Sequence, residues 1–237
     1  MKRLLGSILL ITFYSSCYGL NFAEIKNLSR AIARDPMPTS GNPRVAEVLV
    51  SSFVNIAQQE TCMFTWCLEA SVNIPVVAGQ NEYAFTSDMV AVDRVYLDNK
   101  QITSTSKVKL DIKDPAWRVN LATFTPQNYY MDSMLRVIGF DSFPDTKTDH
   151  IITVTYVKNP IFLTNDYDVP FDSQQRLSSF QYLLCLWTAA FICYTDNRPT
   201  EGDRYYQMWT QRISNMSSTI RLSGDYYPSI GGSNNGK

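Results

Sequence analysis

Residues 180–194, FQYLLCLWTAAFICY, constrain the fold most because they are apolar on nearly every side of a helix. One stripe at helical spacing contains Phe180, Leu184, Trp187, Phe191 and Tyr194, and the other sides carry Leu183, Cys185, Leu186 and Ile192. Such a helix has to bury more than one face. The apolar run is shorter than the ~20 residues that a membrane span needs. We therefore expect it to pack on its own helical hairpin, with a neighbouring subunit as a further candidate.

Helical periodicity also occurs before and after this stretch. Residues 21–33 and about 44–70 each carry an apolar stripe, and Pro36, Pro38 and Pro43 separate the two segments. Asp172 or Ser173 is a plausible N-cap for the long apolar helix. A further helix is expected over about 204–216. The two ends of the chain are thus predicted to be helical.

Between these helical ends, the period changes to two from Val72 onward. The strand patterns are VNIPVVAG, NEYAF, VAVDRVYLD, KVKLDIK, WRVNLATF, MLRVIGF and IITVTYV. Asp98-Asn99 is a tight-turn signal between two of the expected strands. Short strands at close spacing predict an antiparallel sandwich or a small barrel.

The order of helices, strands and helices predicts an α+β fold in which one domain is inserted into another. We expect a four-helix bundle formed by the N- and C-terminal segments, an inserted antiparallel β-sandwich or small barrel, and a flexible C-terminal tail. The predicted division is an N-terminal arm or signal-like extension at 1–19, a helical hairpin at 20–70, the β domain at 71–165, a second hairpin at 166–218 and the tail at 219–237. The last residues are rich in Gly, Ser and Asn and have lost periodicity.

The first 19 residues allow three readings. Lys2 and Arg3, an apolar run and then small residues are typical of a secretory signal. Ser15-Ser16-Cys17 also resembles a lipoprotein box, although Tyr14 replaces the usual aliphatic residue. The other readings are an apolar N-terminal arm and an extension from a start codon placed too early.

Composition excludes several function classes. The net charge is −1 and the pI about 5.8, which argues against a basic surface that binds phosphates without sequence specificity. The five cysteines lie mostly within apolar helical patterns, so buried free thiols are favoured over disulfides or a zinc site. The 14 tyrosines suit protein–protein interfaces, which tolerate amphipathic rings.

No residue pattern indicates catalysis. His150 is the one histidine, and no nucleophile motif such as G-x-S-x-G accompanies it. Asp166, Asp168 and Asp172 could hold a cation through oxygen ligands, but their spacing is not that of an EF-hand. The sequence has no phosphate-binding glycine loop and no zinc ligand set. We predict a protein that is not an enzyme and that has no metal or cofactor.

A series of short motifs resembles the head-to-tail adaptor (connector or neck) proteins of tailed double-stranded DNA bacteriophages, particularly short-tailed ones. The similar residues, in chain order, are Asn55 and Ala57 in VNIAQQE, Tyr83 in GQNEYAF, Pro126 and Tyr129 in TPQNYY, Pro144 and Asp145 in GFDSFPD, Tyr156 and Pro160 in ITVTYVKNP, and the segment DYDVP. The resemblance runs from about residue 20 to 220. Two departures are Phe85-Thr86, where the family has Leu-Pro, and the extension before Leu20.

The resemblance implies a virion structural protein at the head–tail junction, assembled in the host cytoplasm. Such proteins form a homo-oligomeric ring, typically twelve-fold, beneath the portal protein. They extend the DNA channel, through which DNA passes without sequence-specific binding, and they dock a downstream tail or nozzle protein. The competing hypothesis is an exported or lipid-anchored bacterial β-sandwich binding protein, secreted or periplasmic.

Aromatic residues are the candidate subunit or partner contacts. They are Tyr129, Tyr130, Trp187, Phe191, Tyr205, Tyr206, Trp209, Tyr226 and Tyr227. In each tyrosine pair of a strand or helix the two rings diverge, so one is expected in the core and its partner at a contact.

Overall fold

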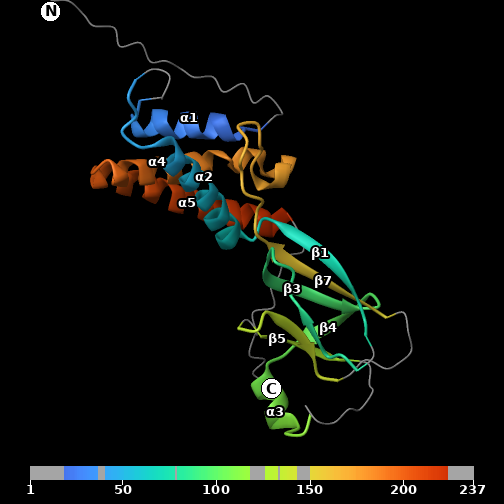
Figure 1. Cartoon of the computed structure of the whole chain (residues 1–237). Coiled ribbons are helices and arrows are strands. Elements are labelled where there is room, and N and C mark those ends of the chain that lie inside the picture. Colours follow the sequence, from blue (N-terminus) through green and yellow to red (C-terminus); the bar gives the residue numbers. More distant parts are fainter. Residues whose placement is uncertain are drawn as a thin grey trace, which may run out of the picture.

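The computed structural model describes residues 19–36, 41–77, 79–117, 126–132, 134–142 and 150–223, apart from the side chains of 221–223. Within these residues the chain forms five α-helices and seven β-strands, arranged as a helical part and a sheet part (Figure 1). The helices are α1 (Phe22–Ala33), α2 (Glu47–Thr65), α3 (Lys107–Lys113), α4 (Tyr182–Thr195) and α5 (Pro199–Ser223). The strands are β1 (Glu69–Pro75), β2 (Glu82–Ala84), β3 (Met89–Leu97), β4 (Lys100–Ser104), β5 (Asn128–Asp132), β6 (Val137–Phe140) and β7 (Ile151–Lys158).

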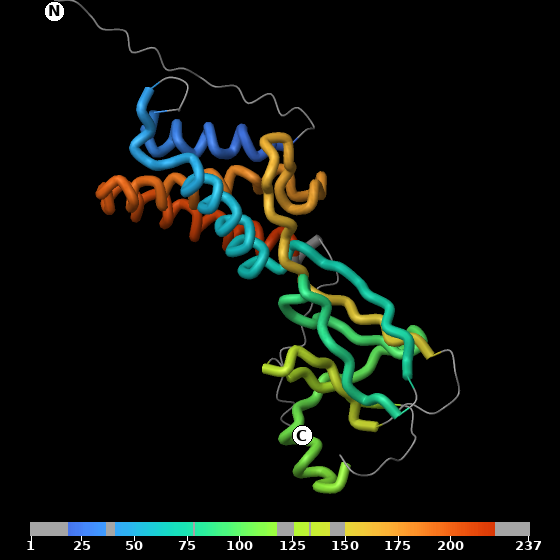
Figure 2. The backbone as a smooth tube through the Cα atoms, in the orientation of Figure 1, coloured from blue at the N-terminus to red at the C-terminus, as the bar shows by residue number. Residues whose placement is uncertain are grey.

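Helix α4 is the centre of the helical part. Its residues from Leu183 to Ala190 are all buried, because α1, α2 and α5 each pack against it. Helices α1, α4 and α5 run roughly along one another, while α2 crosses them obliquely (Figure 2). The predicted four-helix bundle is therefore wrong. The all-round apolar surface of α4 requires neighbours on several sides, and a central helix with three covering helices satisfies that requirement.

The sheet part is one curled, seven-stranded mixed sheet in the order β1-β7-β3-β4-β5-β6-β2. Strands β4 and β5 pair in parallel through Thr103 and Ser104, and the other pairs are antiparallel. The predicted antiparallel β-sandwich or small barrel is therefore also wrong. The Asp98-Asn99 turn between β3 and β4 is confirmed, with φ of 49° and 65°, as a two-residue hairpin turn requires.

Helix α3 replaces a predicted strand. The alternation in KVKLDIK predicts a strand with Val108, Leu110 and Ile112 on one face. In the structure the Ser106 hydroxyl accepts a hydrogen bond from the Lys109 amide at 3.2 Å and caps a helix instead. Leu110 is then buried while Val108 and Ile112 are exposed. The following expected strand, WRVNLATF, lies mostly outside the described residues.

The predicted N-cap of α4 is wrong as well. Asp172 has a φ of 54°, and α4 begins only at Tyr182, after 3-10 turns over Phe171–Ser173 and Gln175–Phe180. The Asp172 carboxylate is used elsewhere, because it accepts from the Ile161 amide at 2.9 Å and pairs with Lys158. The predicted flexible tail at 219–237 lies mostly outside the described residues.

Two amides on α2 hold the segment that leads from the sheet back to the helices. The Asn55 side chain accepts from the Leu163 amide at 2.8 Å and donates to the Leu163 carbonyl at 3.0 Å. The Gln58 side chain donates to the Ile161 carbonyl at 3.0 Å and accepts from the Phe171 amide at 2.7 Å. The backbone groups of the buried Leu163 and Phe171 therefore find hydrogen-bond partners outside any α-helix or strand.

A buried charge cluster joins α1 to the start of α2. Arg30 is fully buried and pairs with Asp35, with Glu47 at 2.8 Å and with the Val45 carbonyl at 3.0 Å. Lys26 bridges Glu47 and Asp166, each at 2.9 Å. Burial raises the pKa of Glu47, but the hydrogen bonds from Arg30 and Lys26 outweigh it and hold this pKa below its ordinary value.

Replacing Asn55 by Ala is expected to lower the free energy of unfolding by about 1–3 kcal/mol, because the Leu163 amide and carbonyl lose their partner in a buried place. Denaturant unfolding measures the change. Asn27→Ala, at an exposed position of α1, is the control. Equal losses in the two variants would contradict the role of Asn55.

The Glu47 cluster predicts a pH dependence. A carboxylate whose folded pKa is depressed stabilises the fold above its unfolded pKa, and this stabilisation is lost as pH falls through the folded pKa. Between about pH 6 and about pH 3, Glu47→Gln should therefore lose less stability than the wild type. Denaturant midpoints at several pH values test this, with Glu60→Gln on the same helix as control. Parallel curves for wild type and Glu47→Gln would exclude the proposed linkage.

Candidate assembly surfaces

The tyrosine pair of β5 is buried on both sides of the sheet. Tyr129 lies in the main core of the sheet, and Tyr130 packs under α3 with Trp117 at a ring distance of 5.5 Å. The Tyr130 hydroxyl donates to Glu82 at 2.7 Å. Neither ring of this pair is exposed, because α3 covers the face of β5 that a bare sheet would leave open. A contact role for either ring stays a prediction.

The aromatic candidates of α4 and α5 are mostly inside the helical part. Trp187 is buried and stacks on the half-buried Phe191 at 3.8 Å. The half-buried Tyr205 donates to the Ile32 carbonyl at 2.8 Å, and Trp209 is buried. Tyr206 is the exposed member of the described set, at 39 %. Tyr226 and Tyr227 lie outside the described residues, so their contact role stays a prediction.

The exposed apolar surface of the helical part lies on α2 rather than on α4. Its outward side chains, hereafter the α2 stripe, are Val48, Leu49, Ile56, Met63 and Phe64. They recur at helical spacing over most of the helix, where a helix facing water normally carries charged residues. The apolar stripe that the sequence predicts for this helix consists of Val45, Leu49, Phe53, Ile56, Met63 and Cys67. The structure instead buries the opposite face, which contains Val50, Val54, Ala57 and Cys62.

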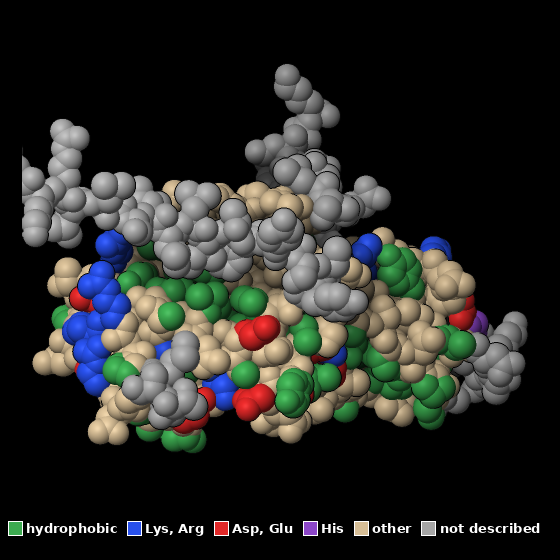
Figure 3. Space-filling model, turned by 90° about the horizontal axis from the view of Figure 1, so that it is seen from above, with side chains coloured by type: hydrophobic (Ala, Val, Ile, Leu, Met, Phe, Trp, Pro, Cys, Tyr) green, Lys and Arg blue, Asp and Glu red, His purple; other side chains and the backbone are tan. Residues whose placement is uncertain are grey.

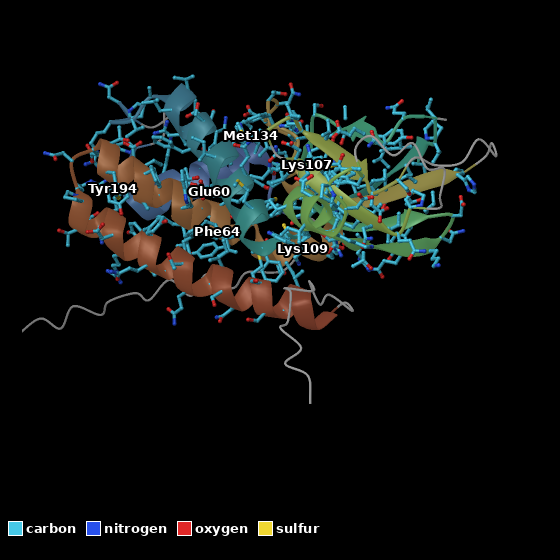
Figure 4. The ribbon with its side chains drawn as sticks, turned by 90° about the horizontal axis from the view of Figure 1, so that it is seen from below. Glu60, Phe64, Lys107, Lys109, Met134 and Tyr194 are labelled. Carbon is cyan, nitrogen blue, oxygen red and sulfur yellow. The ribbon has the colours of Figure 1, made fainter. Side chains whose placement is uncertain are left out.

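Aromatic rings extend the α2 stripe toward α5. Phe64, 58 % exposed, meets Trp209 edge-on at 5.8 Å, and Tyr206 lies 5.4 Å from the same ring. Figure 4 shows Glu60 and Phe64 on α2 beside α5. The stripe therefore ends in an aromatic cluster that is buried at its base and open at its outer edge.

A second apolar surface lies on the sheet part, where α3 is at the end distant from the helices (Figure 1). It combines α3 with the turn between β5 and β6, and its exposed side chains, hereafter the tip surface, are Val108, Ile112, Met131, Met134 and Leu135. Met134 is 95 % exposed and Ile112 78 %. A groove of about 440 Å³ runs between Val108, Met131 and Met134. In Figure 4, Met134 and Lys107 are labelled close to each other, and Lys109 lies farther from Met134.

Asp132 fixes the parts of the tip surface to each other. One carboxylate oxygen accepts from Lys107 of α3 at 2.7 Å. The other accepts from the amides of Met134 and Leu135, at 3.1 and 3.0 Å. The Lys107 hydrogen bond, with help from the Leu135 amide, lowers the pKa of Asp132. These hydrogen bonds fix the β5–β6 turn to α3 on the two sides of the groove.

The three aspartates that could hold a cation, Asp166, Asp168 and Asp172, have other partners. Asp166 pairs with Lys26, Asp168 accepts from the amides of Thr164 and Asn165, and Asp172 pairs with Lys158. No group of three His, Cys, Asp or Glu residues that could hold a metal ion occurs among the residues that the structure describes. His150 lies against Asp98, which also accepts from the Ile151 amide at 3.0 Å. This pair closes the end of the β3–β4 turn.

The described cysteines are free and buried, as predicted. The Cys67 thiol donates to the Cys62 sulfur at 3.6 Å, at the point where α2 gives way to β1. Cys17 lies outside the described residues.

One described helical stretch, Gln175–Thr195, is long and apolar enough to cross a membrane. Two thirds of its most apolar window, 67 %, is buried inside the protein. The core helix of a globular protein has the same composition, and the packing of α1, α2 and α5 around α4 accounts for it. The stretch exceeds the apolar run seen in the sequence because the 3-10 turn before α4 adds to its length.

Similarity to known proteins covers nearly all of these elements. A family model described as SU10 adaptor protein matches residues 20–231. The match begins one residue before Asn21, the N-cap of α1, and includes both apolar surfaces. Among curated proteins no match is found.

Replacing Asp132 by Ala is expected to release the turn that carries Met134. Loss of the two amide hydrogen bonds, each worth about 1 kcal/mol, should speed amide exchange of Met134 and Leu135 roughly fivefold or more. Hydrogen exchange followed by NMR measures this, with the amide of Val154 in the middle of β7 as the internal reference. Unchanged exchange at both turn amides would show that Asp132 does not hold the turn.

Proposed function

Because the chain belongs to the SU10 adaptor protein family of phage head-to-tail adaptors, we propose that it forms a homo-oligomeric ring under the portal of a short-tailed, double-stranded DNA phage. The ring is twelve-fold, is assembled in the host cytoplasm, extends the DNA channel and carries the next tail or nozzle protein. The protein has a structural role and no enzymatic one. The exported or lipid-anchored alternative has no support from this family.

The observation that carries the ring proposal is the α2 stripe. Monomeric proteins rarely expose contiguous apolar patches of this kind, and such patches mark interaction sites. Val48, Ile56 and Met63 are 70, 41 and 53 % exposed, although they lie on a helix whose other face is firmly packed. A second copy of the chain would bury them. A ring uses two different flanks of each subunit, and the stripe is one of them.

The division of the chain into a helical part and a sheet part fits the role of a ring subunit. We propose that residues 20–70 and 166–218 form the ring body and that 71–165 projects from it. Tyr206, at the edge of the aromatic cluster, extends the contact of the stripe. The near balance of 21 Lys and Arg with 22 Asp and Glu supports a channel through which DNA moves, because tight binding requires several cations that neutralise phosphates.

The double variant Leu49→Asp/Ile56→Asp tests the ring. Both side chains are exposed, so the protomer should fold normally, while charges placed in a buried contact should prevent assembly. Negative-stain imaging of the protein with its portal, together with native mass spectrometry, should show rings for the wild type and isolated subunits for the variant.

The matched control is Val77→Asp, which places the same charge at an exposed apolar position of the sheet part. Circular dichroism checks that both proteins are folded. A wild type that forms no ring on the portal would refute the proposed function. Normal rings in the double variant would show that another surface joins the subunits.

A further inference from the structure

Two thiols meet at the end of α2. The Cys67 thiol donates to the Cys62 sulfur, and the two sulfur atoms are 3.6 Å apart. The sulfurs of a disulfide lie about 2 Å apart, so movements of about 1–2 Å separate this contact from a covalent bond. Cys185, by contrast, directs its thiol to the carbonyls of Ile25 and Gln181.

The cap of α2 brings the two thiols together. Trp66 has a φ of 56°, and its amide donates to the Cys62 carbonyl at 2.8 Å. Such a cap folds the next residue back over the last turn of the helix, where two apolar side chains frequently meet. Here both of these side chains are cysteines, Cys62 in the last turn and Cys67 after the cap. An aliphatic pair would fill the same contact but could not be oxidised.

The pair lies where the chain passes from the helical part to the sheet part, at residues 62–69, hereafter the α2–β1 corner (Figure 1). The Cys67 carbonyl accepts from Arg176 at 3.2 Å, and the Leu68 carbonyl accepts from the Lys158 amide at 3.0 Å. The outgoing chain is therefore bonded to the returning chain at this corner. A bond between the two sulfurs would fix the last turn of α2 to it.

The surface of the molecule shields the two sulfurs from large reagents. On the face seen from above, hydrophobic side chains are interspersed with polar ones (Figure 3). Cys62 and Cys67 are each 1 % exposed, and Trp66 beside them is 37 % exposed. Helix ends open locally at low free energy. A small oxidant such as a peroxide therefore reaches the sulfurs more readily than a folded oxidoreductase does.

The two thiols differ in acidity. The hydrogen bond with Cys62 lowers the pKa of Cys67, although burial opposes it, and Arg176 adds to the lowering. The same hydrogen bond, together with burial, raises the pKa of Cys62. Burial raises the pKa of Cys185 to about 12. Because the thiolate is the reactive form, Cys67 is the sulfur that attacks an oxidant first.

We propose that Cys62 and Cys67 form a reversible redox site, in which a peroxide converts the two thiols into a disulfide that fixes the α2–β1 corner. The Cys67 thiolate attacks the O–O bond and becomes a sulfenic acid, while the departing hydroxide takes up the proton that Cys67 lost. The Cys62 thiol then attacks the sulfenic sulfur, the S–S bond forms and a second water leaves. The two electrons lost by the thiols reduce one peroxide. This inference does not depend on the proposed ring.

Counting thiols on the folded full-length protein tests the proposal. The protein is treated with hydrogen peroxide, unfolded in guanidinium with N-ethylmaleimide and digested with trypsin. Residues 45–94 form one tryptic peptide, with Cys62 and Cys67, and residues 177–204 form another, with Cys185 and Cys193. The first peptide is expected to lose both maleimide labels and to become lighter by two hydrogen atoms. The second should keep both labels, and dithiothreitol should restore those of the first.

Single substitutions separate the two steps. In Cys62→Ala the Cys67 sulfenic acid has no partner, so dimedone should trap it. In Cys67→Ala the Cys62 label should survive the same peroxide treatment. Cys185→Ala is the matched control, since it removes a buried thiol outside the pair and should form the disulfide as the wild type does.

Hydrogen exchange measures whether the bond fixes the corner. The disulfide should slow exchange of the Trp66 amide about tenfold or more, because this amide lies within the loop that the bond closes. The amide of Val154 in β7 should exchange at the same rate in the reduced and oxidised proteins.

Three results would overturn the proposal. Both labels retained on the 45–94 peptide at every peroxide concentration that leaves the protein folded would reduce the pair to an apolar contact. Equal loss of labels from the two peptides would show unselective oxidation. A disulfide that leaves exchange at Trp66 unchanged would show that the bond does not fix the corner. Ring formation on the portal enters none of these measurements, so the proposed function is judged separately.

Discussion

The two amides of α2 connect the helical part to the sheet part, and the remaining architecture depends on them. Asn55 and Gln58 satisfy the backbone of residues 161–171, a segment with little regular structure of its own. Leu163 and Phe171 in this segment are buried, and buried amides and carbonyls have to find partners. The contacts fix where the chain re-enters the helical part, and so they fix how the sheet is oriented to α4. Asn55 also belongs to the motifs that the sequence shares with adaptor proteins.

Periodicity predicted most elements where it was long and repeated. Helices α1 and α2 and strands β3 and β7 lie close to the expected ranges. Helix α5 begins five residues earlier and ends seven residues later than the expected helix at 204–216. The arrangement of the helices was predicted less well, because a stripe on a helix does not say which side faces the core. Both faces of α2 carry apolar residues, and Leu49 and Ile56 were assigned to the wrong one. The apolar side chains on the several faces of α4, which suggested a subunit contact, are buried within the chain.

The tip surface could not be predicted from alternation alone. KVKLDIK has the pattern of a strand, and only the Ser106 cap and the burial of Leu110 under Trp117 and Tyr130 select a helix. Seven residues give two turns of helix, too few for helical periodicity to outweigh a strict alternation. Aromatic residues were predicted as contacts because rings are common at protein–protein interfaces. The structure places most of the described ones in the core and exposes aliphatic and methionine side chains instead.

The contact between Asn55 and Leu163 joins residues 108 positions apart, and this separation has a consequence for biosynthesis. Helices α1 and α2 leave the ribosome well before α4 has been translated, so the faces that later cover α4 remain in water while the whole sheet is made. Long-range contacts of this kind form slowly, and uncovered apolar segments aggregate in the meantime. Folding of the sheet as soon as β7 is complete would draw the two ends together and shorten that interval. A nascent chain paused before α4 is therefore the species that would attract host chaperones.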